Sequence, residues 1–171
     1  MKESSVAFTG HRSIPQERLT PLREALEKQI EALYYQGYQT FYNGAACGFD
    51  LHAAAMTCRV RLRHPEIRLI LALPGQGQTE KWSDADKKLY ETIVREADEV
   101  VYPCGEERYV SRETYLARDR YMIDQSTVCL CYLTKKTGGT AYTVRYAEEQ
   151  KKVVINIADL LDPGQSDRED A

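Results

Sequence analysis

The sequence contains no long hydrophobic run. No apolar stretch approaches the ~20 consecutive residues that a membrane-spanning helix needs, so we expect no membrane span. Residues 1–5 also lack the pattern of a secretory signal peptide, which favours a cytoplasmic protein. Basic residues are not in excess, because the formal net charge is −3. A chain with this balance has no overall attraction for polyanions.

Cysteine and histidine are scarce. The five cysteines are odd in number and scattered, and without an export signal they do not suggest a disulfide framework. Cys129 and Cys131 share one face of a predicted strand, and we expect them to be buried thiols that act as small apolar side chains. The three histidines are not spaced to complete a zinc site, and no Ser-His-Asp or Cys-His arrangement follows from spacing. We therefore predict no metal ion and no cofactor.

The remaining composition is that of an ordinary globular domain. Hydrophobic residues make up 43% and charged residues 29% of 171 residues, which is enough chain for one domain with a sizeable core. We assign residues 1–160 to a single domain, because no repeat or linker divides them. Residues 161–171 are polar and acidic, and we expect them to form a disordered tail.

Segments of strand character alternate with segments of helical periodicity. Leu22, Leu26 and Ile30 recur at helical spacing, and Gly37 follows where a C-terminal cap belongs. The run 67–73 is almost continuously apolar, as expected of a strand covered on both faces. The predicted strands are 6–8, 38–42, 67–73, 99–102, 127–133 and 153–157, and the predicted helices are 16–35, 51–61, 82–93, 113–124 and 141–150. This alternation predicts an α/β fold, a three-layer sandwich with a mostly parallel sheet of about six strands.

Three polar or glycine-containing turns follow the first, second and fifth predicted strands. They comprise residues 9–12, 43–52 and 137–140. In parallel sheets, ligands bind at the carboxyl ends of the strands where the strand order reverses. Glycines in such turns let a ligand approach the backbone, and the following helices direct N–H groups at it. We expect these turns to converge on one phosphate-bearing ligand.

Several side chains in the first two turns could contact that ligand. His11 and Arg12 follow the first strand, and the guanidinium of Arg12 suits a phosphate, although it could equally be a solvated loop arginine. Asp50 is either the N-cap of the next helix or an acceptor for a ribose hydroxyl. His52 lies near the same position, either at the ligand or packed at the helix start.

The third turn and the helix before it supply further candidates. The glycines at 138 and 139 leave N–H groups open to a phosphate, although the turn could also be a flexible loop with Thr140 as N-cap. The turn does not match the P-loop pattern. Arg118 lies on the helix that leads into the fifth strand, so it can reach the same place. The candidate ligand-binding residues are Thr9, Gly10, His11, Arg12, Gly44, Gly48, Asp50, His52, Arg118, Gly138, Gly139 and Thr140, and Asp50 and Arg118 are also the candidates for catalysis.

Two other groups of residues have less specific patterns. Tyr42, Trp82 and Tyr109 offer stacking surfaces for a base, or belong to the core or its rim. A basic group is predicted at the far end of the second helix, where we interpret it as ordinary surface, with weak nucleic-acid binding as the alternative; it comprises Arg59, Arg61, Arg63, His64 and Arg68.

Taken together, the motifs resemble a known family. The segments 8–12, 44–54 and 138–144, with Trp82 and the run 120–126, are similar to the YpsA-like family of bacterial proteins. The resemblance extends to about residue 157. It implies a Rossmann-like fold of the SLOG superfamily, whose members bind or process nucleotide-derived ligands.

Two distant relatives within that superfamily are also similar. Arg118 and Met122 match the Arg-Lys-x-x-Met helix of Lonely Guy phosphoribohydrolases, with Asp119 at the lysine position. The dipeptide 139–140 matches their Gly-Thr, but Thr143 stands where their catalytic glutamate would be, which disfavours cleavage of an N-glycosidic bond. The segment 48–54 is similar to the Gly-x-Asp-x-x-Ala-His turn of DprA, a DNA-processing protein.

These observations favour a protein that binds a nucleotide-like small molecule, and a sensor is one interpretation of that role. A phosphoribohydrolase-like enzyme acting on a nucleoside monophosphate and a single-stranded nucleic-acid binder are the alternatives. The acidic charge balance disfavours nucleic acid as the main partner. The sequence leaves open whether a reaction is catalysed and whether the chain forms a homo-oligomer.

Overall fold

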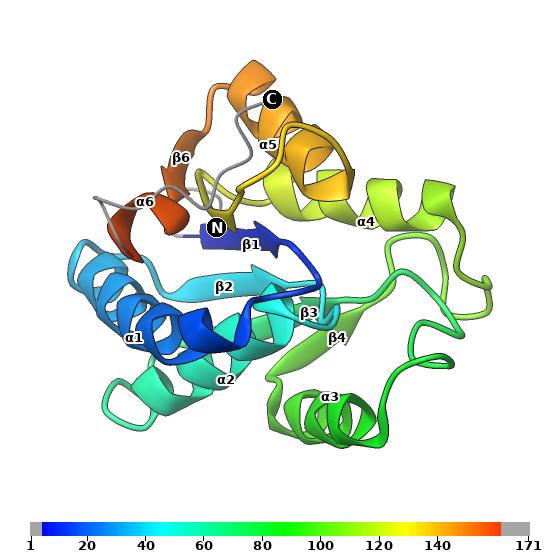
Figure 1. The fold of residues 1–171 in the computed structure, drawn as a ribbon, viewed down its shortest axis with the longest axis horizontal. Helices are drawn as coiled ribbons and strands as arrows, with labels where there is room; N and C mark the ends of the chain where they lie inside the picture. Colours follow the sequence, from blue (N-terminus) through cyan, green and yellow to red (C-terminus); the bar gives the residue numbers. More distant parts are fainter. Residues whose placement is uncertain (1–4, 162–171) are drawn as a thin grey trace.

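A computed structural model describes residues 5–161 and contains one sheet of six parallel strands (Figure 1). The strand order is β4-β3-β2-β1-β5-β6, and every adjacent pair is parallel. The α/β, Rossmann-like prediction is therefore confirmed, with a sheet that is wholly rather than mostly parallel. The strands are β1 (Ser5–Gly10), β2 (Thr40–Asn43), β3 (Arg68–Ala72), β4 (Glu99–Val101), β5 (Val128–Tyr132) and β6 (Val153–Asn156).

Helices connect successive strands and lie on both faces of the sheet. Within residues 5–161 they are α1 (Leu19–Tyr35), α2 (Phe49–Arg61), α3 (Asp84–Glu96), α4 (Arg112–Asp124), α5 (Gly139–Glu149) and α6 (Ala158–Leu161), with a short 3₁₀ helix at Gln16–Arg18. Short α6 was not expected. Trp82 lies before α3 rather than inside it, because Ser83 caps that helix by accepting a hydrogen bond from the Asp86 amide.

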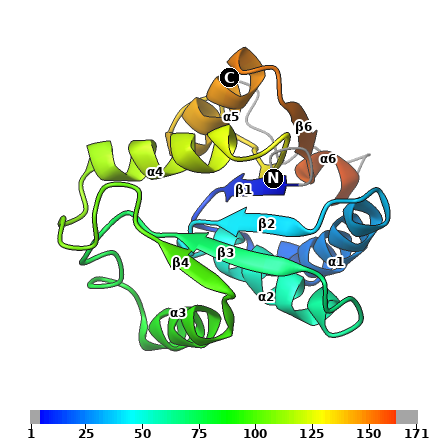
Figure 2. The ribbon, with the colours of Figure 1, turned by 180° about the vertical axis from the view of Figure 1, so that it is seen from behind.

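Two layers of helices enclose the sheet. The helices α1, α2 and α3 lie on one face and α4 and α5 on the other, as opposite views show (Figures 1 and 2). The predicted stripe of α1 faces the sheet, since Leu22, Leu26 and Ile30 are fully buried with Phe8 of β1. On the opposite face, Met122 of α4 packs with Cys129 and other small residues of the sheet. This smaller cluster lets α4 and α5 approach the strands closely.

The strand order reverses at β1. This strand pairs with β2 on one side and with β5 on the other, so the connections after β1 and β5 diverge to opposite faces. Such a switch point leaves a crevice at the carboxyl edge of the sheet. The three predicted turns all begin at this edge, after β1, β2 and β5.

Two further predictions concern the tail of the chain and a membrane span. Residues 162–171 of the predicted tail lie outside the described residues, so the assigned domain boundary stays a prediction. Within residues 5–161 no helix has the length and apolar character to cross a membrane.

Candidate functional site

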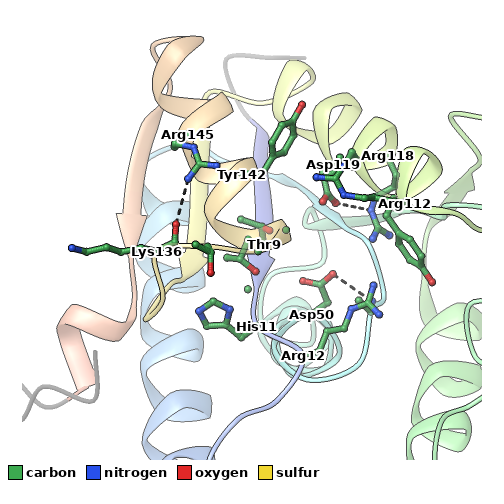
Figure 3. A pocket seen from close by; sticks show the side chains of 18 residues that line it. Thr9, His11, Arg12, Asp50, Arg112, Arg118, Asp119, Lys136, Tyr142 and Arg145 are labelled. Atoms are coloured by element: carbon green, nitrogen blue, oxygen red, sulfur yellow. Dashed lines mark hydrogen bonds and ion pairs between the residues drawn. The ribbon is translucent and has the colours of Figure 1, made fainter. Parts of the chain in front are cut away.

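A cavity of about 730 Å³ lies at the switch point (Figure 3). Its walls come from the turns after β1 and β5, the first turn of α2, one side of α4 and the beginning of α5. The lining residues are Thr9, Gly10, His11, Arg12, Ala46, Asp50, Arg112, Tyr115, Leu116, Arg118, Asp119, Lys136, Thr137, Gly138, Gly139, Thr140, Tyr142 and Arg145. The structure thus brings together nine of the residues that the sequence singled out.

The first and second turns are packed against each other through two glycines. A Cβ on Gly10 would lie 2.4 Å from the ring of Phe49, and a Cβ on Gly48 would lie 2.2 Å from the carbonyl oxygen of Arg12. Gly48 also has a φ of +81°, which favours glycine. The Phe49 amide donates to the His11 carbonyl at 3.0 Å. The absence of a side chain at these two glycines therefore allows the two turns to pack in direct contact.

His11 joins the first turn to the segment after β5. Its Nε2 accepts a hydrogen bond from the Thr134 amide at 2.9 Å. A ring nitrogen that accepts a hydrogen bond carries no proton, so the imidazole is neutral in this arrangement. The ring also meets Tyr132 edge-on, with 6.0 Å between centroids. His11 thereby fixes one wall of the cavity relative to another.

Asp50 lies inside the first turn of α2, not at its N-cap. The N-cap position is occupied by Gly48, and no side chain caps the helix. The N-cap interpretation of Asp50 is therefore wrong, because helix α2 begins at Phe49. Its carboxylate accepts a long hydrogen bond of 3.4 Å from the Ala46 amide and is only 6% exposed.

The environment of Asp50 favours its neutral form. Burial raises the pKa of this carboxyl to about 7. The positive charge of Arg118 lowers the pKa of Asp50, and the negative charge of Asp119 raises it. The Ala46 amide and Arg12 lower the pKa by smaller amounts. Asp50 therefore holds a proton that can be exchanged near neutral pH.

Arg118 is a buried arginine beside Asp50 that hydrogen-bonds several segments of the chain. Its guanidinium donates to the carbonyl oxygens of Gly44 at 2.7 Å and Ala72 at 3.2 Å, and to Asp119 at 2.7 Å. The side chain is almost fully buried. A Cβ on Gly44 would lie 2.5 Å from Arg118 Nη1, so glycine at 44 makes room for the guanidinium. Arg118 thus ties α4 to the ends of β2 and β3.

Asp119 uses both carboxylate oxygens within the protein. Oδ1 accepts from Arg118, and Oδ2 accepts from the Thr143 hydroxyl at 3.1 Å. The Thr143 hydroxyl also lies 2.9 Å from the Gly139 carbonyl, so its single proton is shared between the two acceptors, and the contact joins α4 to the first turn of α5. The carboxylate on this wall therefore comes from α4, while α5 supplies a hydroxyl.

The amino end of α5 faces open space. Gly138 is the N-cap with a φ of +101°, so the interpretation of Thr140 as N-cap is wrong. A Cβ on Gly138 or Gly139 would meet nothing within 4 Å. No packing contact therefore requires glycine there, in contrast to Gly10 and Gly48. The first amides of a helix have no intrahelical acceptor, and they make this end favourable for an anion.

Basic side chains predominate around the cavity. The lining includes five of them, namely Arg12, Arg112, Arg118, Lys136 and Arg145, against the carboxylates of Asp50 and Asp119. Tyr115 lies between two of the arginines, with Cζ of Arg12 4.8 Å and Cζ of Arg118 5.6 Å from its ring centroid. The cavity is thus cationic in a chain whose net charge is −3.

Sequence reasoning did not single out several of the lining residues. Arg112, Tyr115, Leu116 and Asp119 recur at helical spacing on α4 and form one wall with Arg118. On the opposite side the missed residues are Lys136, Tyr142 and Arg145 of the β5–α5 region, whereas Thr137 and Ala46 belong to two of the predicted turns. The spacing of the α4 residues was a usable signal, because a helix that leads to the switch point presents one side to it.

Several predicted residues do not line the cavity. Gly44 and Gly48 lie behind its wall, and His52 contacts Arg23 of α1, with 3.3 Å between Nδ1 and Nη1. Burial, and then Arg23, lowers the pKa of His52. The stacking candidates Tyr42, Trp82 and Tyr109 are also outside the lining. Ligand binding by any of these residues stays a prediction.

The basic group at the far end of α2 is engaged in surface ion pairs. Arg61 pairs with Asp98 at 2.6 Å, and Arg63 pairs with Glu27 and Glu31. His64 shares Glu31 at 2.6 Å. Among residues 5–161, no group of three or more potential ligands is arranged to hold a metal ion.

The fold and this cavity together define a Rossmann-like α/β domain with a predominantly basic cavity at its switch point. The YpsA family model, described as the YspA SLOG family, matches residues 6–162, and the chain belongs to this family. The resemblance inferred from the sequence motifs is thereby confirmed. A UPF0398 protein of Halalkalibacterium halodurans is 26% identical over 151 residues, which cover 88% of this chain and 77% of that protein.

Solved structures of other proteins share the fold. DprA from Streptococcus pneumoniae has a TM-score of 0.62 at 20% identity, covering 94% of this chain and 53% of that chain. DprA from Helicobacter pylori, described with a single-stranded DNA binding mode, has a TM-score of 0.62 at 17% identity, covering 88% and 63%. A molybdenum cofactor binding protein from Rippkaea orientalis has a TM-score of 0.55 at 18% identity, covering 91% and 77%. The chain spans about half of the Streptococcus DprA.

Proposed function

We propose that this protein binds a nucleotide-derived small molecule in the switch-point cavity, with the phosphate of the ligand at the amino end of α5. The observation that carries the proposal is the open start of α5: Gly138 has a φ of +101° that favours glycine, whereas neither the backbone nor a packing contact explains the glycine at Gly139. Lys136 and Arg145 both line this side of the cavity. Helix amides and nearby cations both favour a phosphate.

The size and shape of the cavity fit such a ligand. Its volume of about 730 Å³ lies within the ordinary range of small-molecule sites. The Tyr115 ring and the Tyr142 ring both line it, and aromatic faces of this kind can stack on a base. Similarity to a molybdenum cofactor binding protein supports a small-molecule ligand for this fold. Function still has to be argued from the site itself, since one fold serves many activities.

Isothermal titration with nucleoside monophosphates and ADP-ribose tests the proposal. Lys136 lines the cavity and Lys135 is an exposed neighbour that does not, so the two alanine variants remove the same charge at adjacent positions. We expect Lys136→Ala to weaken binding about tenfold, the size of one charge-assisted hydrogen bond. Lys135→Ala should bind like the unchanged protein.

Two results would count against the proposal. One is the absence of binding across the whole panel, and the other is an equal loss of affinity in both lysine variants. The same incubations, analysed by chromatography for free base, test the enzyme alternative directly. Release of base would identify a hydrolase, whereas binding without release would favour a binding protein.

Single-stranded nucleic acid is a second candidate partner. The comparison with DprA does not support our expectation that nucleic acid is disfavoured, because a DprA structure is described with a single-stranded DNA binding mode. The net charge of −3 also conceals a local excess of basic side chains at the cavity. A gel shift with short oligonucleotides at low salt separates the two candidates, since phosphate contacts are strongest there.

A further inference from the structure

One carboxylate in the cavity has unused hydrogen-bonding capacity. Asp50 is only 6% exposed, and its Oδ1 has no hydrogen-bond partner among residues 5–161. The other oxygen accepts a long contact from Ala46, and the guanidinium of Arg12 lies beside the carboxylate (Figure 3). Buried polar atoms in folded proteins nearly always have partners, so an exception at the wall of a cavity points to a group supplied by a ligand.

The second carboxylate of the cavity is not available in this way. Asp119 accepts from Arg118 through Oδ1 and from Thr143 through Oδ2. Both of its carboxylate oxygens are therefore engaged within the protein. Asp50 is the cavity carboxylate that can accept an additional donor.

The positions of the charges restrict the chemistry of that donor. Figure 3 shows Asp50 projecting into the cavity from α2, whereas Lys136 and Arg145 lie on the other side, near α5. An anionic group of the ligand is drawn to the cations, and it is repelled by Asp50 whenever that carboxyl is ionised. A neutral hydroxyl suits Asp50, and adjacent hydroxyls on a sugar can satisfy both carboxylate oxygens.

We propose that Asp50 binds the sugar hydroxyls of a ribosyl phosphate whose phosphate lies at the amino end of α5. This inference rests on the proposed function and identifies the ligand class of the same site. Arg12 is exposed and points toward Asp50 in Figure 3, so rotation of the Arg12 side chain opens the carboxylate to the sugar. The pocket then distinguishes ribose from deoxyribose through one buried acceptor.

Titration calorimetry with AMP, 2′-deoxy-AMP and 2′,3′-dideoxy-AMP tests the inference. We expect AMP to bind at least about tenfold more tightly than the dideoxy compound, because the latter leaves the buried acceptor unpaired. Asp50→Asn should retain binding of dideoxy-AMP and lose most of the preference for AMP. Asp84→Asn, the same change at an exposed position of α3, should keep the full preference.

The outcomes separate this inference from the proposed function. Equal affinity for the three compounds, or an undiminished preference in Asp50→Asn, overturns hydroxyl recognition while phosphate binding stands. Failure of the unchanged protein to bind any of them contradicts both proposals. The comparison of ligands on the unchanged protein needs no variant, so it decides the matter even if Asp50→Asn folds poorly.

Discussion

Replacing Asp50 with asparagine is expected to abolish a large pH dependence of stability. The pKa of Asp50 is about 7 in the folded protein, against about 3.9 for an unperturbed aspartate. A raised pKa means that the carboxyl contributes its full stability below the unfolded pKa and loses it as the pH rises through 7. The unchanged protein should therefore lose about 4 kcal/mol relative to Asp50→Asn between pH 4 and pH 8.

The groups around Asp50 support this direction. Arg118 and Arg12 favour its ionised form, but burial outweighs them, and Asp119 opposes a second negative charge. Asparagine has nearly the same shape and cannot ionise. Urea denaturation of both proteins at several pH values measures the difference, with Asp84→Asn as the exposed control. If the free energy of unfolding changed with pH in the same way for Asp50→Asn and the unchanged protein, burial of Asp50 would not control its protonation.

Arg118→Met is expected to destabilise the protein by about 3–5 kcal/mol, the cost of removing one partner of a buried ion pair. The change leaves the carbonyls of Gly44 and Ala72 and the Oδ1 of Asp119 without this donor. It also removes the positive charge that lies between two carboxylates. The account therefore predicts a fall in the free energy of unfolding together with loosening of the contact between α4 and the sheet.

A matched variant distinguishes this effect from the general loss of an arginine. Arg120 lies two residues further along α4, outside the cavity lining, and donates to the Tyr142 hydroxyl at 2.9 Å. Arg120→Met should cost only about 1 kcal/mol, the value of an ordinary hydrogen bond. Urea denaturation of both variants at the same pH makes the comparison. Similar losses in the two would contradict a special structural role for Arg118.

The order of strands and helices was predictable because burial in a parallel sheet leaves a clear pattern. The continuous apolar run of β3 indicates a strand covered on both faces, and the apolar stripe of α1 indicates the side of the helix that packs on the sheet. The ends of the elements were less accurate. Glycines delimit two of them, since α2 follows Gly48 and α5 follows Gly138, and each helix begins two residues before the predicted start.

The roles of individual site residues were harder to predict. Gly10 and Gly139 have the same sequence context, a turn after a strand, but Gly10 meets Phe49 and Gly139 meets nothing. That difference depends on contacts between segments far apart in the chain. Likewise, the sequence placed Arg118 near the cavity but could not show that its guanidinium is buried against Gly44.

The central claim is that the turns after β1, β2 and β5 form one ligand site with the phosphate at the amino end of α5, and an amide chemical-shift titration with AMP tests it most directly. The account predicts that the largest shifts in ¹⁵N–¹H spectra occur at Gly139, Thr140 and Arg12, with Asp50 also affected. Largest shifts at the far end of α2, around 59–68, would contradict it, as would spectra unchanged by saturating AMP.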